Sequence, residues 1–270
     1  PGRYGRSQDH TQRWAHCFMN KQELKSFLDF KSQHYESEFF IAHDPIQIPH
    51  QFSKKEDIEI AGFLTATIAW GNRVSILKSA EKMMDIMEGA PHDFVLHHKT
   101  KDLNNFRGFV HRTFNEEDIQ YFIRSLSNIY KHHGGLEGVF SDGEIQIQER
   151  IHRFKQIFFK LNHLPRTQKH VSDPLRGSAA KRINMFLRWM VRSNEKGVDF
   201  GLWKKISPSM LSIPLDVHTG NVARKLKLLK RKQNDAKALQ SLDLSLRKFD
   251  PDDPVKYDFA LYGLGAFEKF

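Results

Sequence analysis

The chain has 270 residues, a hydrophobic fraction of 39% that includes 22 Phe, and a formal net charge of +10. This length and the area that the aromatic side chains can bury exclude a disordered chain, and the basic excess favours nucleic acid over an anionic membrane surface as the partner. The single cysteine, Cys17, excludes a disulfide framework, a structural zinc site or an iron–sulfur cluster built within one chain.

The first part of the chain carries no sign of membrane targeting. No apolar run reaches the roughly 18 residues of a membrane span, and residues 1–18 are polar and basic without an apolar signal core. We therefore expect a cytoplasmic protein with no membrane contact, associated with the nucleoid if it is bacterial. Because Met19 opens the first helical segment, we interpret residues 1–18 as an extension outside the fold, disordered or non-native.

Apolar residues at helical spacing predict helices along most of the chain. In the first half, the predicted helices cover residues 21–37, 54–70, 74–87 and 116–133. Ser53 and Glu56 form a capping-box pattern at the second of these helices, and Asn115 can cap the fourth.

The second half continues in the same way. The predicted helices cover residues 146–161, 178–192, 203–206, 217–230, 236–249 and 254–267, the last capped by Asp253. Residues 163–176 are polar, basic and broken by two prolines, which predicts a loop. Because strand-like alternation is scarce, the sequence predicts an all-α fold.

Asp216 occupies a position that suits a functional carboxylate. Pro214 favours an extended residue before it, so Asp216 falls at the N-cap of a basic helix. There the backbone N–H groups and the helix dipole stabilise an ionised carboxylate. From the pattern alone, a structural N-cap and a packed or solvated His218 remain the plain alternative.

The segment from Pro214 to His218, Pro-Leu-Asp-Val-His, resembles the Pro-Val-Asp-(Thr/Val)-His element of the helix-hairpin-helix DNA glycosylase superfamily. The Val-x-Arg-x-Leu pattern of residues 222–226 follows it, as in that superfamily. The resemblance implies that Asp216 is the catalytic carboxylate. It also implies a two-lobed fold with the active site in the cleft between a lobe of residues 19–145 and a lobe of residues 146–270, with helices that cross between the lobes.

The second element of that superfamily is a helical hairpin that carries a lysine in its bifunctional members. Here Gly177 and Lys181 take these positions, at the start of an apolar helix. Burial and the helix dipole favour the neutral amine, which is the form that attacks a sugar C1′ and forms a Schiff base. A phosphate-contacting or solvated lysine, next to Arg176 and Arg182, is the alternative.

The chain also departs from the usual pattern. Residues 173–177, Asp-Pro-Leu-Arg-Gly, replace the common Leu-Pro-Gly-Val-Gly hairpin, and 35 residues separate Lys181 from Asp216. The nearest resemblance is therefore to the archaeal 8-oxoguanine DNA glycosylase type, or to an uncharacterised bacterial family related to it. That type contacts the flipped base with an acidic and an aromatic residue one turn apart, which implies this role for Asp258 and Tyr262. A capping or salt-bridged Asp and a core Tyr are the alternative.

Two further groups complete the prediction. Trp70 either stacks on a base from the loop before Arg73 or belongs to the core. The residues expected to contact the DNA backbone are Arg73, Arg176, Gly177, Arg182, His218 and Arg224.

The resemblance implies a monomeric glycosylase with AP-lyase activity that removes an oxidised, 8-oxoguanine-like purine from double-stranded DNA without a cofactor or metal. A non-catalytic nucleic-acid-binding protein on the same fold is the first alternative. A metal-dependent hydrolase is the second, although the adjacent His pairs of this chain cannot share a helical face.

Overall fold

The computed structural model describes residues 19–270, so the expectation for residues 1–18 lies outside the described part of the chain. The described residues are mainly helical and include one antiparallel pair of two-residue strands. The prediction of an all-α fold is therefore confirmed. None of the described helices combines enough length and apolar character to cross a membrane.

The elements before residue 145 are mostly short. The α-helices are α2 (Lys21–Tyr35), α3 (Glu38–Ala42), α4 (Lys55–Thr67), α5 (Arg73–Ile86), α6 (Pro91–His97), α7 (Glu116–His132) and α8 (Gly135–Ser141). Between them lie the 3-10 helices η1 (Pro45–Gln47), η2 (Pro49–Gln51) and η3 (Asp102–Phe106) and the strands β1 (Val110–His111) and β2 (Phe114–Asn115).

The elements after residue 145 carry most of the predicted site. The α-helices are α9 (Ile147–Phe158), α10 (Lys181–Val191), α11 (Val217–Lys225), α12 (Ala236–Arg247) and α13 (Tyr257–Ala266). The 3-10 helices are η4 (Pro165–His170), η5 (Pro174–Arg176), η6 (Pro208–Met210) and η7 (Pro254–Lys256).

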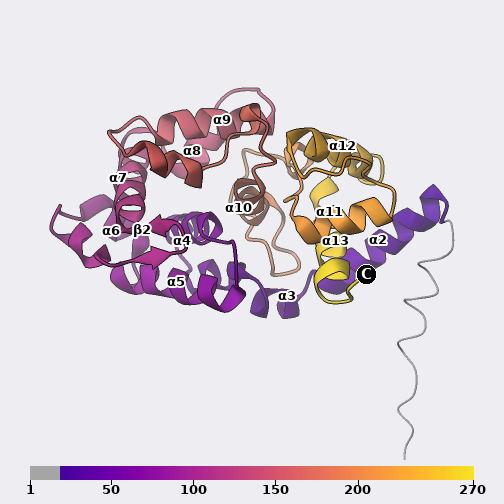
Figure 1. Cartoon of the computed structure of the whole chain (residues 1–270), viewed down its shortest axis with the longest axis horizontal. Helices are drawn as coiled ribbons and strands as arrows, with labels where there is room; N and C mark the ends of the chain where they lie inside the picture. Colours follow the sequence, from indigo (N-terminus) through magenta and orange to yellow (C-terminus); the bar gives the residue numbers. More distant parts are fainter. Residues whose placement is uncertain (1–18) are drawn as a thin grey trace, which may run out of the picture.

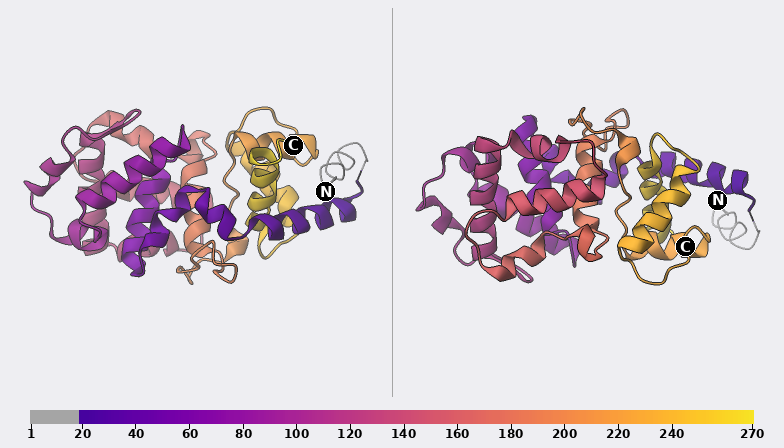
Figure 2. Two further views of the ribbon diagram at one scale, coloured as in Figure 1. Left: turned by 90° about the horizontal axis from the view of Figure 1, so that it is seen from below. Right: turned by 90° about the horizontal axis from the view of Figure 1, so that it is seen from above.

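The helices form two groups along the long axis of the molecule. In the larger group, α4 packs against α5, α6 and α10, while α7, α8 and α9 pack on one another (Figure 1). In the smaller group, α13 packs against both α2 and α11. Both views in Figure 2 show α2 beside the helices coloured orange to yellow, so the first and last described helices meet at one end of the molecule.

Some helices pack across the predicted boundary between residues 145 and 146. Helices α9 and α10 come after that boundary but pack with α4, α7 and α8, and α2 comes before it but packs with α13. The reason lies in α10, whose residues 183–191 are all buried. A helix buried on every side needs neighbours all around it, and α10 accordingly lies between the two groups in Figure 1.

Several local predictions were wrong. The N-cap of α4 is Lys54 and no side chain caps it, so Ser53 and Glu56 form no capping box. Residues 203–206 form no helix, and α3, α6 and α8 were not predicted. Asp253 makes no cap hydrogen bond and instead pairs with Arg192, with 2.8 Å between carboxylate and guanidinium.

Candidate functional site

A strained turn fixes the start of α10. Gly177 has a φ of 92°, and Ala180, which is buried, has a φ of 45°. The left-handed conformation costs a non-glycine residue on the order of 1 kcal/mol. The side chain of Asn184 holds the turn in place, because its Nδ2 donates to the carbonyl oxygen of Ala179 at 2.9 Å. The helix therefore begins at Lys181 rather than at the predicted residue 178.

Lys181 is a partly buried amine without a carboxylate partner. Its Nζ lies 3.4 Å from the sulfur of Met185, one turn further along α10. Within residues 19–270, no acidic side chain forms an ion pair with it. The amine is therefore not held by a salt bridge and faces the space described below.

Asp216 is the N-cap of α11, as its sequence context predicts. Its carboxylate accepts a hydrogen bond from the backbone N–H of Thr219 at 2.8 Å. Its backbone carbonyl accepts one from Nδ2 of Asn234 at 2.8 Å. The cap orients the carboxylate, and the partly exposed side chain is still free to face a cavity. The structural N-cap and the functional carboxylate are thus compatible roles for one residue.

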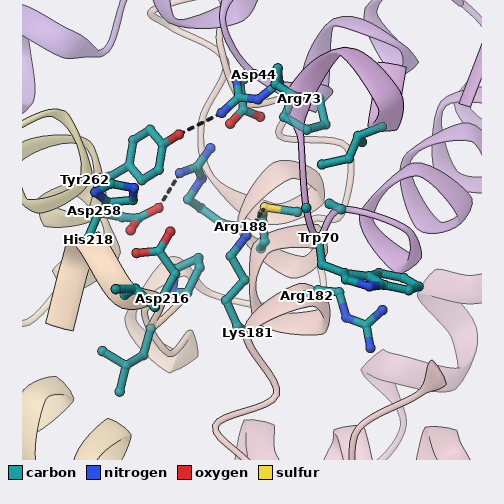
Figure 3. Close-up of a pocket in the computed structure, with 18 of the residues that line it drawn as sticks. Asp44, Trp70, Arg73, Lys181, Arg182, Arg188, Asp216, His218, Asp258 and Tyr262 are labelled. Carbon is teal, nitrogen blue, oxygen red and sulfur yellow. Dashed lines mark hydrogen bonds and ion pairs between the residues drawn. The ribbon is translucent and has the colours of Figure 1, made fainter. Parts of the chain in front are cut away.

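A cavity of about 620 Å³ brings most of the predicted site residues together. The predicted residues that line it are Trp70, Arg73, Lys181, Arg182, Asp216, His218, Asp258 and Tyr262. In Figure 3, Lys181 and Asp216 extend into the same space, with Trp70 on the opposite side from His218 and Tyr262. Residues from α3, α5, α10, α11 and α13, and from the loop after α4, therefore converge on one pocket.

Asp258 is a buried carboxylate in an ion pair with Arg188. The two side chains approach to 2.6 Å, and Arg188 also lies 3.2 Å from Asp199. Burial raises the pKa of Asp258 to about 6, helped by the charge of Asp216 and opposed mainly by Arg188. Nη2 of Arg188 is buried with no hydrogen-bond partner among the described residues. Asp258 therefore forms the salt bridge that the alternative interpretation of this residue expects, and it also lines the pocket.

Tyr262 joins the two groups of helices across the pocket. Its hydroxyl accepts a hydrogen bond from Nη2 of Arg73 at 2.7 Å, and burial raises its pKa (Figure 3). Its ring also packs edge-on against His218, with 5.9 Å between the ring centroids. Gly265 keeps this packing close, because a Cβ there would lie 3.0 Å from the Cβ of His218.

Trp70 forms the opposite wall together with Arg182. The guanidinium of Arg182 lies 4.7 Å from the centre of the Trp70 ring, and it donates a hydrogen bond to the carbonyl oxygen of Thr67. Burial lowers the pKa of Arg182 to about 10. A cation held in this way supports the orientation of the ring. Arg182 therefore forms part of the pocket wall.

The pocket lies almost entirely within a region shared with a known sequence family. The sequence model of a family described as "Protein of unknown function (DUF2400)" matches residues 44–267. The chain belongs to this family. Searches of curated proteins and of solved structures gave no match. In this DUF2400 protein, the matched range contains every pocket residue except Phe40.

Three of the residues expected to contact DNA lie outside the pocket. Arg176 is highly exposed, with 82% of its side chain accessible, and Gly177 is exposed beside it. Arg224 is engaged within the DUF2400 fold: its Nε donates to the carbonyl oxygen of Arg231 at 2.8 Å, and its Nη2 donates to Asn234 at 2.5 Å. Its side chain holds the chain after α11 in place.

Four further side chains of the pocket were not predicted from the sequence: the polar Asp44, Arg188 and Asn234, and the thioether of Met185. Arg188 could have been predicted, because a charged residue within the apolar run of residues 183–191 needs a buried partner of opposite charge. The others have no such local signal. Within residues 19–270, no group of three or more His, Cys, Asp or Glu side chains is placed to hold a metal ion.

Proposed function

We propose that this chain is a DNA glycosylase with AP-lyase activity that removes an oxidised purine from double-stranded DNA, on a two-lobed helix-hairpin-helix fold. The observation that carries the proposal is the convergence of Lys181 and Asp216 on one cavity with Trp70, Asp258 and Tyr262. The Gly177 turn between α9 and α10 takes the place of the hairpin, and the two groups of helices are the lobes.

The proposed reaction begins with base flipping into the cavity, where Trp70 offers a ring face and Asp258 an acceptor. Nζ of Lys181 attacks C1′ of the sugar. The glycosidic bond breaks, and its electron pair leaves with the base, which takes up a proton. The carboxylate of Asp216 stabilises the positive charge that develops on the sugar. The amine adduct then rearranges to a Schiff base, from which β-elimination breaks the C3′–O bond.

The test compares wild type with Lys181→Gln and Asp216→Asn on duplexes that carry 8-oxoguanine, other lesions or an abasic site, with and without borohydride. Wild type should excise one lesion class, and borohydride should trap a covalent adduct by reducing the Schiff base. Lys181→Gln should abolish trapping, and Asp216→Asn should slow excision by about 100-fold or more. Lys99→Gln is the matched control, because Lys99 is exposed and outside the pocket.

Each contrary result has a clear meaning. If wild type binds DNA but neither cuts nor traps on any duplex, the chain is the non-catalytic nucleic-acid-binding protein on the same fold. If Lys181→Gln still traps at the wild-type level, another amine is the nucleophile and the assignment of Lys181 is wrong.

A further inference from the structure

The segment of residues 231–236 contacts both halves of the proposed active site. On one side, the backbone N–H of Ala236 donates to the carbonyl oxygen of Gly177 at 3.0 Å, and Asp235 forms an isolated β-bridge with Ser178. On the other side, Nδ2 of Asn234 donates to the backbone carbonyl of Asp216 at 2.8 Å. The segment therefore joins the turn before Lys181 to the cap that carries the carboxylate.

Asn234 is held rigidly in this position. Its Oδ1 accepts a hydrogen bond from Nη2 of Arg224 at 2.5 Å, while Nε of the same guanidinium donates to the backbone of Arg231. Gly220 makes room for the amide, because a Cβ there would lie 2.6 Å from its Oδ1. Both functional groups of the Asn234 amide are thus used, which fixes its orientation.

We propose that Asn234 is a positioning residue for Asp216, and that the segment of residues 231–236 sets the separation between Asp216 and Lys181. The inference rests on the proposed function. The hydrogen bond from Asn234 restrains the backbone of the N-cap residue, so it determines the direction in which the Asp216 carboxylate points. A misplacement of about 1 Å can cost as much as 100-fold in rate. Lys181 depends on a different contact, the backbone bond between Ala236 and Gly177.

The test uses Asn234→Ala and Asn234→Asp. The aspartate keeps an acceptor for Arg224 but cannot donate to the carbonyl of Asp216. Asn221→Ala is the matched control, because Asn221 is exposed on α11 itself. In single-turnover assays, both Asn234 variants should excise the lesion more slowly by about 10-fold or more. Lesion-duplex affinity and borohydride trapping on an abasic duplex should stay at the wild-type level.

A second measurement does not depend on activity. Loss of the Asn234 bond should loosen the first turn of α11, so hydrogen exchange of the Thr219 and Gly220 amides should accelerate in both variants and not in Asn221→Ala. Wild-type excision rates and unchanged exchange in Asn234→Ala would overturn the inference. If wild type is inactive on every duplex but exchange accelerates in the variants, the positioning contact stands and the proposed function fails.

Discussion

Asp258 shows how one side chain can be a structural ion-pair partner and still line the proposed active site. Its pair with Arg188 satisfies a buried charge, yet burial keeps its pKa near 6. Its carboxylate also accepts a hydrogen bond of 3.4 Å from the hydroxyl of Thr219, whose backbone N–H donates to the Asp216 carboxylate. The protonation state of Asp258 is therefore linked to the geometry of the proposed catalytic carboxylate.

We expect base excision to fall as the pH drops through about 6, because protonated Asp258 loses its charge pairing with Arg188 and becomes a weaker hydrogen-bond acceptor for the base. This loss does not reflect unfolding. The pKa in the folded state lies above the ordinary value of 3.8, so this group stabilises the fold most at low pH and loses that contribution as the pH rises through 6.

Asp258→Asn tests this expectation. The amide does not titrate, so the decline in single-turnover excision near pH 6 should disappear, at a lower overall rate. Circular dichroism at each pH checks that both proteins stay folded. An acid limb of unchanged midpoint in the variant would show that another group controls it.

At the scale of elements, the contact between α2 and α13 requires a missing side chain. A Cβ at Gly263 would lie 2.2 Å from Cδ2 of Tyr35, a buried residue of α2. The hydroxyl of Tyr35 donates to Glu268, so the ring cannot move aside freely. The close packing of these two helices sets the position of α13, and with it the positions of Asp258 and Tyr262.

Gly263→Ala should therefore lower the free energy of unfolding by about 1–3 kcal/mol, as expected for an overpacked contact. Gly62→Ala is the matched control within α4, because the nearest atom to its new Cβ is the flexible methyl of Met190 at 3.2 Å. Urea unfolding at pH 7 measures both. Equal stability of the two variants would mean that α2 can shift away from α13 at little cost.

The features that were predicted best from the sequence are those that depend on local structure. The N-cap at Asp216 and the long amphipathic helices follow from patterns within one or two turns, and the structure contains them. Asp258 pairs with Arg188, which is 70 positions away in the chain. Tyr262 pairs with Arg73, which is 189 positions away. No local pattern encodes such pairs, because packing between distant helices decides them.

The short helices were not predicted for a different reason. A helix of five to seven residues, such as α3, α6 or α8, is too short to show a reliable period. Ser53 offered a capping pattern, but the helix starts one residue later than that pattern needs. The pocket residues Asp44 and Asn234 lie in loops, where spacing carries little information about which side chains meet.

At the scale of the whole molecule, the net charge of +10 is unevenly available to a partner. Arg188 is buried, Arg182 is partly buried in the pocket wall, and Arg224 is bonded to its own chain. Arg176 instead projects from the turn before α10. Exposed lysines lie at the end of α11 and after it, at positions 225, 227, 230 and 232. The face that carries this turn and these lysines is the expected surface for a DNA backbone.

Binding to undamaged duplex DNA at several salt concentrations tests this distribution. Arg176→Gln should reduce the slope of log affinity against log salt by about 0.9, the value for one lost phosphate contact. Arg182→Gln should change the slope less than Arg176→Gln, because the Arg182 guanidinium is partly buried, lies over Trp70 and is bonded to the carbonyl oxygen of Thr67. An equal reduction of the slope in Arg182→Gln with a native circular dichroism spectrum would place that side chain at the DNA after all.

The meeting of α2 and α13 has a consequence for the time course of synthesis. Tyr35 and its partner Glu268 are 233 residues apart in the chain. At translation rates of about 5–20 residues per second, α2 emerges roughly 10–50 s before the helix that covers it. During that interval its apolar side has no native partner, and the pocket lacks the wall that holds Asp258 and Tyr262. The growing chain should therefore depend on chaperones in this window, and it becomes competent for its ligand only when the final helix arrives.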